Sequence, residues 1–464
     1  MTEFDLYRSP YSWRYASPAM REIWSETHKR RMWRKMWVAL AQAQSEMGLV
    51  QPEHVEDLRA HEKAVDMARA LEIEAEIHHD LMAELRVFAE QCPVGKGIIH
   101  LGATSMDIED NADALRIRQS LDLTLEKLSA LLDVFAEKML AYADTPVIGF
   151  THIQPAEPTT LGYRLAYYAQ DLLADFNHLS ALREDIKGKG FKGAVGTGAA
   201  YAELLGAENL GRFESRLSAL LDLPFFEVTH QTYPRRQDYM LISGLAGMAA
   251  AVSKFAFDLR LMQSPPIGEW SEPFASRQVG SSAMPFKRNP INAEKINSLA
   301  RMLAQMPPAA WHNAAHSLLE RTLDDSANRR TLLPEAFLIS DELLSTAARI
   351  LRGLVVNEAA VQRNLAAYGP FAATERLLMA LGKAGADRQE MHERLREHAM
   401  TAWQAVQQGQ PNPLVNLLCG DAHITRYLGA DAVRAAMQHD GYTGFAAQRT
   451  RALAEKIHAI RSSP

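Results

Sequence analysis

The sequence predicts an all-α protein built around long helices. Apolar residues recur at three- and four-residue spacing, the period of a helix, over 32–47, 121–143, 161–187, 238–262 and 293–306. Alternating patterns flanked by Asn-Gly or Asp-Gly turns, which would indicate strands, are scarce. The middle of 238–262 is apolar on nearly all sides, which is typical of a helix buried in a large bundle or at a subunit interface. We therefore expect a helical oligomer whose core helices pack across chains.

Size and composition argue against a nucleic-acid-binding, membrane or disulfide-rich secreted protein. The 464 residues are 47% hydrophobic, which predicts more than one domain and a large core. The net charge of -6 is spread without long runs of one sign, so neither a nucleic-acid surface nor a basic membrane face is predicted. Two cysteines, Cys92 and Cys419, do not suggest a disulfide framework. Residues 1–11 do not resemble a signal peptide, and the apolar run 239–253 is short for a membrane span. We expect a soluble, cytoplasmic protein.

Gly- and Pro-rich stretches at 188–198, 223–236 and 263–290 separate the predicted helices. The third ends in Gly280-Ser-Ser-Ala-Met-Pro-Phe-Lys-Arg-Asn-Pro290, which we call the signature loop. Its glycine and two prolines make a continuous helix implausible. Long loops inside a compact domain are often functional, and this one presents a hydroxyl, a cation and an amide close together in sequence. We therefore expect it to carry chemistry.

The signature loop resembles the signature of the fumarase/aspartase superfamily along its whole length. Two further blocks fit that superfamily: His100-Leu-Gly-Ala-Thr-Ser105 and Gly149-Phe-Thr-His-Ile-Gln-Pro155. Within it, the chain is similar to the adenylosuccinate lyase family, particularly the branch that includes the animal enzymes. That likeness rests on Ser9-Pro-Tyr-Ser-Trp-Arg-Tyr-Ala-Ser17 and Glu320-Arg-Thr-Leu-Asp-Asp-Ser-Ala-Asn-Arg-Arg330. The resemblance covers nearly the whole chain and thins after Ala380.

The resemblance implies a three-domain helical lyase: an N-terminal domain over 1–103, a central long-helix bundle with the signature loop over 104–356, and a C-terminal helical domain over 357–464. The central bundle would form a homotetramer in which several chains share each active site. The implied reaction is a carbon–nitrogen lyase reaction, the β-elimination of fumarate from adenylosuccinate to give AMP. The family's second substrate is the succinylaminoimidazole carboxamide ribotide of purine biosynthesis, which gives AICAR. No cofactor or metal is implied.

The implied reaction breaks a C–N bond and a C–H bond on neighbouring carbons, so it needs a base, an acid and a site that stabilises a carbanion. By position, the resemblance implies Ser281 as the base and His152 as the acid. A serine hydroxyl is a poor base unless nearby charge and amide donors stabilise its anion. Lys287 could supply that charge, and Asn289 could donate to the substrate carboxylate.

The non-catalytic alternative for Ser281 is a serine-rich turn beside a solvated lysine. The alternative for His152 is a histidine held at a helix start, where Pro155 and Pro158 would suit the first turn. The flanking motifs favour the catalytic interpretation in both cases.

The resemblance also assigns substrate contacts. Ser326 and Arg330 are four residues apart and share a helix face if the segment is helical, which suits a phosphate. Asp325 and Arg329 have the same spacing, so a paired surface helix is the alternative. His78 and Lys295 stand where close relatives carry arginine and cannot reproduce its forked donors. The implied substrate-binding residues are Arg14, Tyr15, His78, His79, Asp80, Thr104, Ser105, Gln231, Lys295, Arg321, Ser326 and Arg330.

Other functions remain open at this point. The tandem histidines at 78 and 79 could suggest a metal site, but neighbouring helix residues point different ways, and no further Cys/His set with ligand spacing appears. Another fumarate-releasing lyase, such as argininosuccinate lyase, would share the signature loop without needing the segment 321–330. Carboxymuconate cycloisomerase relatives are a weaker alternative, since some lack the acid histidine. A catalytically retired structural relative would tolerate losing Ser281, His152 or Lys287, and the chain keeps all three.

Overall fold

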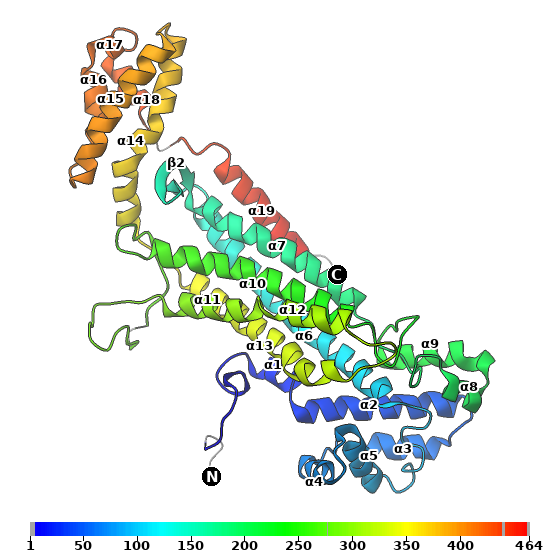
Figure 1. Cartoon of the computed structure of the whole chain (residues 1–464). Helices are drawn as coiled ribbons and strands as arrows, with labels where there is room; N and C mark the ends of the chain where they lie inside the picture. Colours follow the sequence, from blue (N-terminus) through cyan, green and yellow to red (C-terminus); the bar gives the residue numbers. More distant parts are fainter. Residues whose placement is uncertain (1–4, 276, 439–440, 462–464) are drawn as a thin grey trace. The chain divides into compact units, whose positions relative to one another are not determined.

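The computed structural model describes residues 5–275, 277–438 and 441–461, and it confirms the predicted helical fold (Figure 1). Each of the five stretches with helical periodicity falls on a helix. These helices are α2 (Glu26–Glu46), α6 (Ser105–Ala141), α7 (Leu161–Asp185), α10 (Arg236–Met262) and α11 (Ile291–Leu303).

Backbone packing divides the chain into two compact units. The first is Met1–Leu128, Asp175–Ala250 and Leu299–Ser345, and the second is Ser129–Ala174, Ala251–Ser298 and Thr346–Pro464. The long helices α6, α7, α10 and α13 (Asp324–Arg352) contribute residues to both units. The domain boundaries expected after residues 103 and 356 stay a prediction.

Capping side chains explain where several helices of the first unit begin. Ser17, Ser25 and Asp66 each accept a hydrogen bond from the backbone N–H three residues later, which satisfies a donor that the first helical turn leaves open. The shorter helical segments of this unit are the 3-10 turns at Pro10–Ser12 and Ala207–Asn209, α1 (Pro18–Ile23), α3 (Pro52–His61), α4 (Met67–Ile77), α5 (Asp80–Gln91), α8 (Ala199–Leu205), α9 (Leu210–Leu221) and α12 (Met306–Ala315).

The C-terminal helices of the second unit have a core of their own. Buried side chains such as Leu377, Leu381, Met391 and Leu418 pack together there. Figure 1 shows α14 to α18 grouped together. The helices after α13 are α14 (Glu358–Lys383), α15 (Arg388–Gln407), α16 (Leu414–Gly420), α17 (Ala422–Thr425), α18 (Ala430–Ala436) and α19 (Ala446–Arg461).

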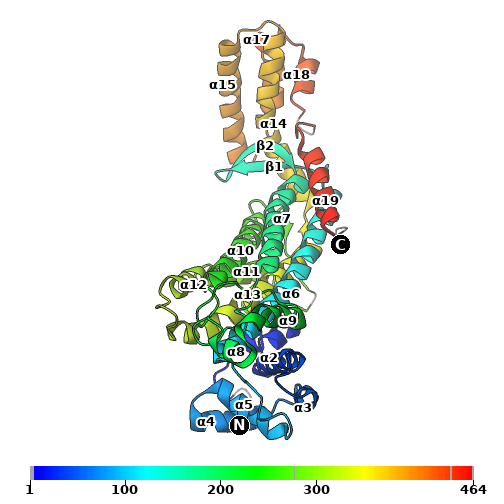
Figure 2. The same ribbon diagram turned by 90° about the vertical axis from the view of Figure 1, so that its right-hand side faces the viewer.

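Two small antiparallel sheets interrupt the helices, and the sequence did not predict them. β1 (Pro146–Thr151) pairs with β2 (Gln154–Thr160) as a hairpin beside α14, as Figure 2 shows. The other sheet pairs β3 (Trp270–Ser271) with β4 (Val355–Val356). Pro155 and Pro158 therefore lie in a strand, and the alternative in which they begin a helix after His152 was wrong.

Helix α10 is the most apolar of the long helices. It is long and apolar enough to cross a membrane by those two criteria alone, and 56% of the apolar window is buried within the chain. That burial is typical of a core helix. After the first turn, the residues left exposed recur at three- and four-residue spacing, so they form one stripe along the helix: Gly247, Ala250, Lys254, Phe257 and Leu261.

Candidate active site

The signature loop is closed at its neck by backbone contacts. The side-chain amide of Asn289 donates to the carbonyl oxygen of Gly280 at 3.0 Å. A Cβ added to Gly280 would lie 2.2 Å from the carbonyl oxygen of Lys287, so no other residue fits there without opening the neck. Gln263 holds the same end of the loop by donating to the carbonyl of Arg288 at 2.9 Å. Asn289, expected to bind a substrate carboxylate, thus has a structural role in this conformation.

Ser281 lies inside this loop with its hydroxyl oxygen already facing hydrogen-bond donors. Its Oγ accepts from the backbone N–H groups of Ala283 at 3.3 Å and Met284 at 3.1 Å. Donors in these positions favour a negatively charged oxygen, because they need not reorganise when charge develops. Lys287 is exposed in the same loop. The arrangement suits a serine that takes a proton.

His152 sits at the tip of the β1–β2 hairpin. Thr151 and Gln154 are paired, so His152 and Ile153 form a two-residue turn, and both have positive φ, 53° and 61°. A two-residue turn of this kind favours glycine and asparagine, and a β-branched residue there is strained. Strained backbone that persists is often found at functional sites. The turn leaves the imidazole exposed.

The predicted acid and base do not meet through direct contacts in one chain. His152, Ser281, Lys287 and Asn289 all belong to the second unit. Within the described residues, no hydrogen bond or ion pair joins His152 to the other three. In this conformation the predicted acid and base therefore lie in the same unit without a direct bond between them.

A polar pocket in the first unit brings together three of the predicted substrate contacts. Asp80, Ser326 and Arg330 line it, and Arg330 donates to the Asp80 carboxylate at 2.9 Å. Burial alone would raise the pKa of Asp80, but Arg330 and Lys29 hold that pKa below its usual value. The rest of the lining is Trp24, Glu26, Lys29, Trp33, Glu109, Asp113, Arg116, Arg329, Leu333 and Pro334.

The tandem histidines mark the junction between α4 and α5. His78 ends α4 in a left-handed conformation with φ 55°. His79 is the N-cap of α5, and its Nδ1 lies 3.5 Å from the backbone nitrogen of Met82. Asp80 opens α5 and points into the pocket lining. The three neighbouring residues thus end one helix, cap the next and begin it.

Thr104 and Ser105 lie at the start of α6. The backbone N–H of Thr104 donates to the carboxylate of Asp107 at 3.0 Å. That carboxylate is fully buried and also accepts from Lys189 and from the backbone N–H of Gly193. The predicted contacts at 104 and 105 are thus fixed to the Gly-rich stretch 188–198.

The remaining predicted contacts are dispersed over both units. The guanidinium of Arg14 lies 5.6 Å from the Trp13 ring centroid, and Tyr15 lies beside Tyr11 with ring centroids 5.8 Å apart. Gln231 donates through its backbone N–H to the carbonyl of Glu320 at 3.2 Å. Arg321 donates to Asp325 at 2.8 Å. Lys295 is half-buried on α11 in the second unit.

Comparison with known proteins decides the family. A family model described as "Lyase" matches residues 13–304, and one described as "Adenylosuccinate lyase C-terminus" matches residues 370–453. An adenylosuccinate lyase of Saccharomyces cerevisiae is 41% identical over 89% of this chain and 87% of its own. One from Schistosoma mansoni is 39% identical over 91% of this chain and 89% of its own. The chain belongs to the adenylosuccinate lyase family. By that membership it is a carbon–nitrogen lyase, and the family match extends past residue 380, where the sequence resemblance thinned.

Solved structures support the fold. A fumarate lyase from Mesorhizobium sp. BNC1 has a TM-score of 0.84 and 23% identity, covering 97% of this chain and 99% of that one. A 3-carboxy-cis,cis-muconate lactonizing enzyme from Pseudomonas putida has a TM-score of 0.86 and 25% identity, covering 97% and 100%. At this identity the likeness concerns the shared helical architecture.

In this adenylosuccinate lyase family member, a network of buried charged side chains lies beside the polar pocket and includes Arg329 of its lining. The sequence did not predict this network. Arg235 joins Asp110 on α6, with Nη1–Oδ1 3.0 Å, to Asp325 on α13, with Nε–Oδ2 2.6 Å. Arg329 donates to Asp238 on α10 at 2.8 Å and to the hydroxyl of Tyr233 at 2.8 Å. The network holds the starts of α10 and α13 against α6.

The alternative that Asp325 and Arg329 pair on a surface helix was wrong. Both side chains are buried, and each bonds to a residue distant in sequence. The sequence signal for this network was the charge of Arg235 and Asp238 at the start of the most apolar helix, where an unpaired buried charge would be costly.

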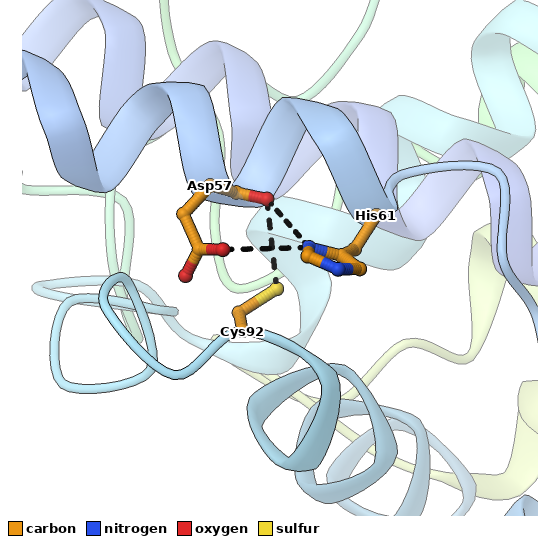
Figure 3. A group of neighbouring side chains, drawn as sticks. All are labelled: Asp57, His61 and Cys92. Carbon is orange, nitrogen blue, oxygen red and sulfur yellow. Dashed lines mark hydrogen bonds and ion pairs between the residues drawn. The ribbon is translucent and has the colours of Figure 1, made fainter.

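Asp57, His61 and Cys92 bring a carboxylate, an imidazole and a thiol together, with ligand atoms within 4.8 Å of one another (Figure 3). The donors already have structural partners: one Asp57 carboxylate oxygen accepts from the backbone N–H groups of Val94 at 2.9 Å and Gly95 at 2.8 Å. Burial raises the pKa of the Cys92 thiol to about 12, which disfavours the thiolate that a metal binds. We interpret the cluster as a tie between α3 and the chain after α5.

Proposed function

We propose that this protein eliminates fumarate from adenylosuccinate, giving AMP, and from the succinylaminoimidazole carboxamide ribotide of purine biosynthesis, giving AICAR. The observation that carries the proposal is the conformation of the signature loop, which presents the Ser281 hydroxyl oxygen to two backbone N–H donors. Family membership supplies the reaction class. The pocket with Ser326 and Arg330 suits the phosphate of a nucleotide substrate, because it offers a hydroxyl and a guanidinium side by side.

In this mechanism Ser281, as its anion, takes the proton from the succinyl carbon next to the carboxylate. The electron pair left on that carbon forms the fumarate double bond as the C–N bond breaks. His152 gives its proton to the departing nitrogen, so the amine leaves neutral. Lys287 and the two backbone donors stabilise the charge on Ser281. Asn289 keeps the loop neck closed and directs its remaining amide hydrogen toward the substrate.

The active form is a homotetramer in which His152 and Ser281 of one site come from different chains. Two observations support this. Among the described residues, no hydrogen bond or ion pair joins the two side chains, and α10 leaves a stripe with Phe257 and Leu261 exposed. Side chains of this kind pack against partner helices when the stripe is covered. The enzyme works in the cytoplasm, which the two free cysteines support.

Complementation tests the reaction and the assembly together. Adenylosuccinate cleavage is followed by purine absorbance and by the fumarate released. Ser281→Ala and His152→Ala should each lose most turnover while retaining substrate binding. Unfolded together and refolded in equal amounts, the two variants should regain activity, since random assortment leaves roughly a quarter of the sites with both residues intact.

Each outcome has a separate meaning. If Ser281→Ala turns over adenylosuccinate like the parent, Ser281 is not the base. If mixed oligomers form and stay as inactive as either variant, the two residues act from the same chain. A parent protein that releases no fumarate from either substrate would refute the proposed function.

A further inference from the structure

Glu109 enters the polar pocket of the first unit from α6. It lies one helical turn after Ser105, so the two side chains share a face of the helix. It lines the same pocket as Asp80, Ser326 and Arg330. Its side chain is partly exposed to the pocket. A carboxyl group that the sequence did not single out thus faces the space where the proposed function places the nucleotide phosphate.

The carboxylates around Glu109 each have a cation. Asp80 accepts from Arg330 at 2.9 Å, and Asp113 lies 3.2 Å from Arg116. Glu109 differs from them: within the described part of the chain, its carboxyl has no hydrogen-bond or ion-pair partner. The charged groups around it are Glu26 and Lys29 from α2, which pair with each other at 2.6 Å, Asp80 from α5, Asp110, Asp113 and Arg116 from α6, and Arg329 and Arg330 from α13.

This environment keeps the proton on Glu109. Burial raises its pKa to about 8, and the negative charges of Asp80, Asp113 and Asp110 act in the same direction. Arg330 opposes the shift, but it is engaged with Asp80. At neutral pH Glu109 is therefore an uncharged acid whose O–H can donate a hydrogen bond. An ionised carboxylate in the same place could only accept hydrogen bonds and would repel an anion.

We propose that Glu109 is a specificity-determining residue of the phosphate subsite: its protonated carboxyl donates a hydrogen bond to the substrate phosphate beside Ser326 and Arg330, and its ionisation ejects the phosphate. The inference rests on the proposed function, which assigns a phosphorylated nucleotide to this pocket. Since Glu109 contacts the phosphate and not the reacting atoms, its ionisation weakens binding and leaves the chemical step unchanged. KM therefore rises with pH while kcat follows the catalytic groups alone.

The expected size follows from the titration. If only the protonated form binds, KM for adenylosuccinate rises about tenfold when the pH is one unit above the pKa of Glu109. Glu109→Gln keeps a donor that cannot ionise, so its KM should stay low from pH 6.5 to pH 9. Glu109→Met keeps the length but has no donor, so its KM should be raised and equally flat. Glu184→Gln is the control, because Glu184 is a surface carboxylate of the same unit that pairs with Arg183 and does not line the pocket, so its KM should change with pH as the parent's does.

The measurement is KM and kcat for adenylosuccinate against pH for the parent and the three variants, with AMP binding measured by calorimetry in parallel. Calorimetry reports on the subsite even for a variant with little turnover. A parent whose KM and AMP affinity change with pH as they do in Glu109→Gln would overturn the role of Glu109 and leave the proposed function intact. Equal AMP affinity in Glu109→Gln and Glu109→Met would overturn the donor role. A parent that neither cleaves adenylosuccinate nor binds AMP would overturn both proposals.

Discussion

Removing the Arg235 guanidinium should strongly destabilise the first unit. Arg235 bonds to Asp110 and Asp325, and all three side chains are at most 3% exposed. Replacing it by methionine fills similar volume but leaves two buried carboxylates without this partner. Breaking a buried pair in this way costs about 3–5 kcal/mol. Asp325 keeps Arg321 and Asp110 keeps the backbone N–H of Tyr233, so we expect the lower end, about 3 kcal/mol.

That free energy corresponds to a Tm lowered by roughly 6–12 °C for a unit of this size. Scanning calorimetry at fixed chain concentration measures it, because association would otherwise shift Tm. Arg183→Met is the matched control, since Arg183 also bonds to a carboxylate, Asp122, but on the surface, where their side chains are 23% and 52% exposed. The control should change stability by less than about 1 kcal/mol. Equal Tm values for the two variants would refute the view that the buried network holds the unit.

A double variant measures how strongly Arg235 and Asp325 depend on each other for their contribution to the free energy of unfolding. Asp325→Asn alone leaves Arg235 with one fewer charged partner, and Arg235→Met alone leaves Asp325 with one fewer. If the two act as one unit, the double variant should lose less stability than the two single losses added together. Strict additivity would show that each side chain is stabilised independently.

Three shorter predictions concern the site. Lys295→Arg should change the ratio of kcat/KM for the two substrates more than it changes Tm; an unchanged ratio with unchanged KM values would remove Lys295 from the site. Ile153→Gly should stabilise the hairpin by roughly 0.5–1 kcal/mol, because glycine accepts the positive φ without strain, and a lowered Tm would contradict this. Gly280→Ala should remove most turnover while retaining Tm, because the added Cβ forces the loop neck open; turnover like the parent's would show that the neck is not needed.

The helical fold could be predicted because periodicity is a local property. The spacing of apolar residues within each segment was enough to predict the helices α6, α7 and α10. The β1–β2 hairpin could not, because its strand β2 contains Pro155 and Pro158 and its turn lacks the usual glycine or asparagine. Tertiary support from α14 stabilises a hairpin that its own sequence does not favour.

Candidate site residues could be proposed from the sequence where they lie within one segment, and their roles stay predictions. The signature loop and the pair of Ser326 and Arg330 were both found in this way. The partners of Arg235 were not, since Asp110 lies 125 residues before it and Asp325 lies 90 residues after it. Glu109 could not be singled out from the sequence either. In sequence it is one acid among several on α6. Only the folded pocket shows that the neighbouring carboxylates are paired with cations, whereas Glu109 is paired with none of the described residues.

The closed neck of the signature loop reduces the conformational entropy that the loop can lose when substrate binds. Fixing the backbone of a free residue costs about 1–2 kcal/mol of conformational entropy, so ordering a slack loop around a substrate would consume much of the binding energy. Here the contacts of Gly280 with Lys287 and Asn289 tie both ends, and Ser281 fixes the first turn inside. A segment tied in this way is already ordered before substrate arrives. Little conformational entropy then remains to be lost on binding, and the serine oxygen already has its two backbone donors.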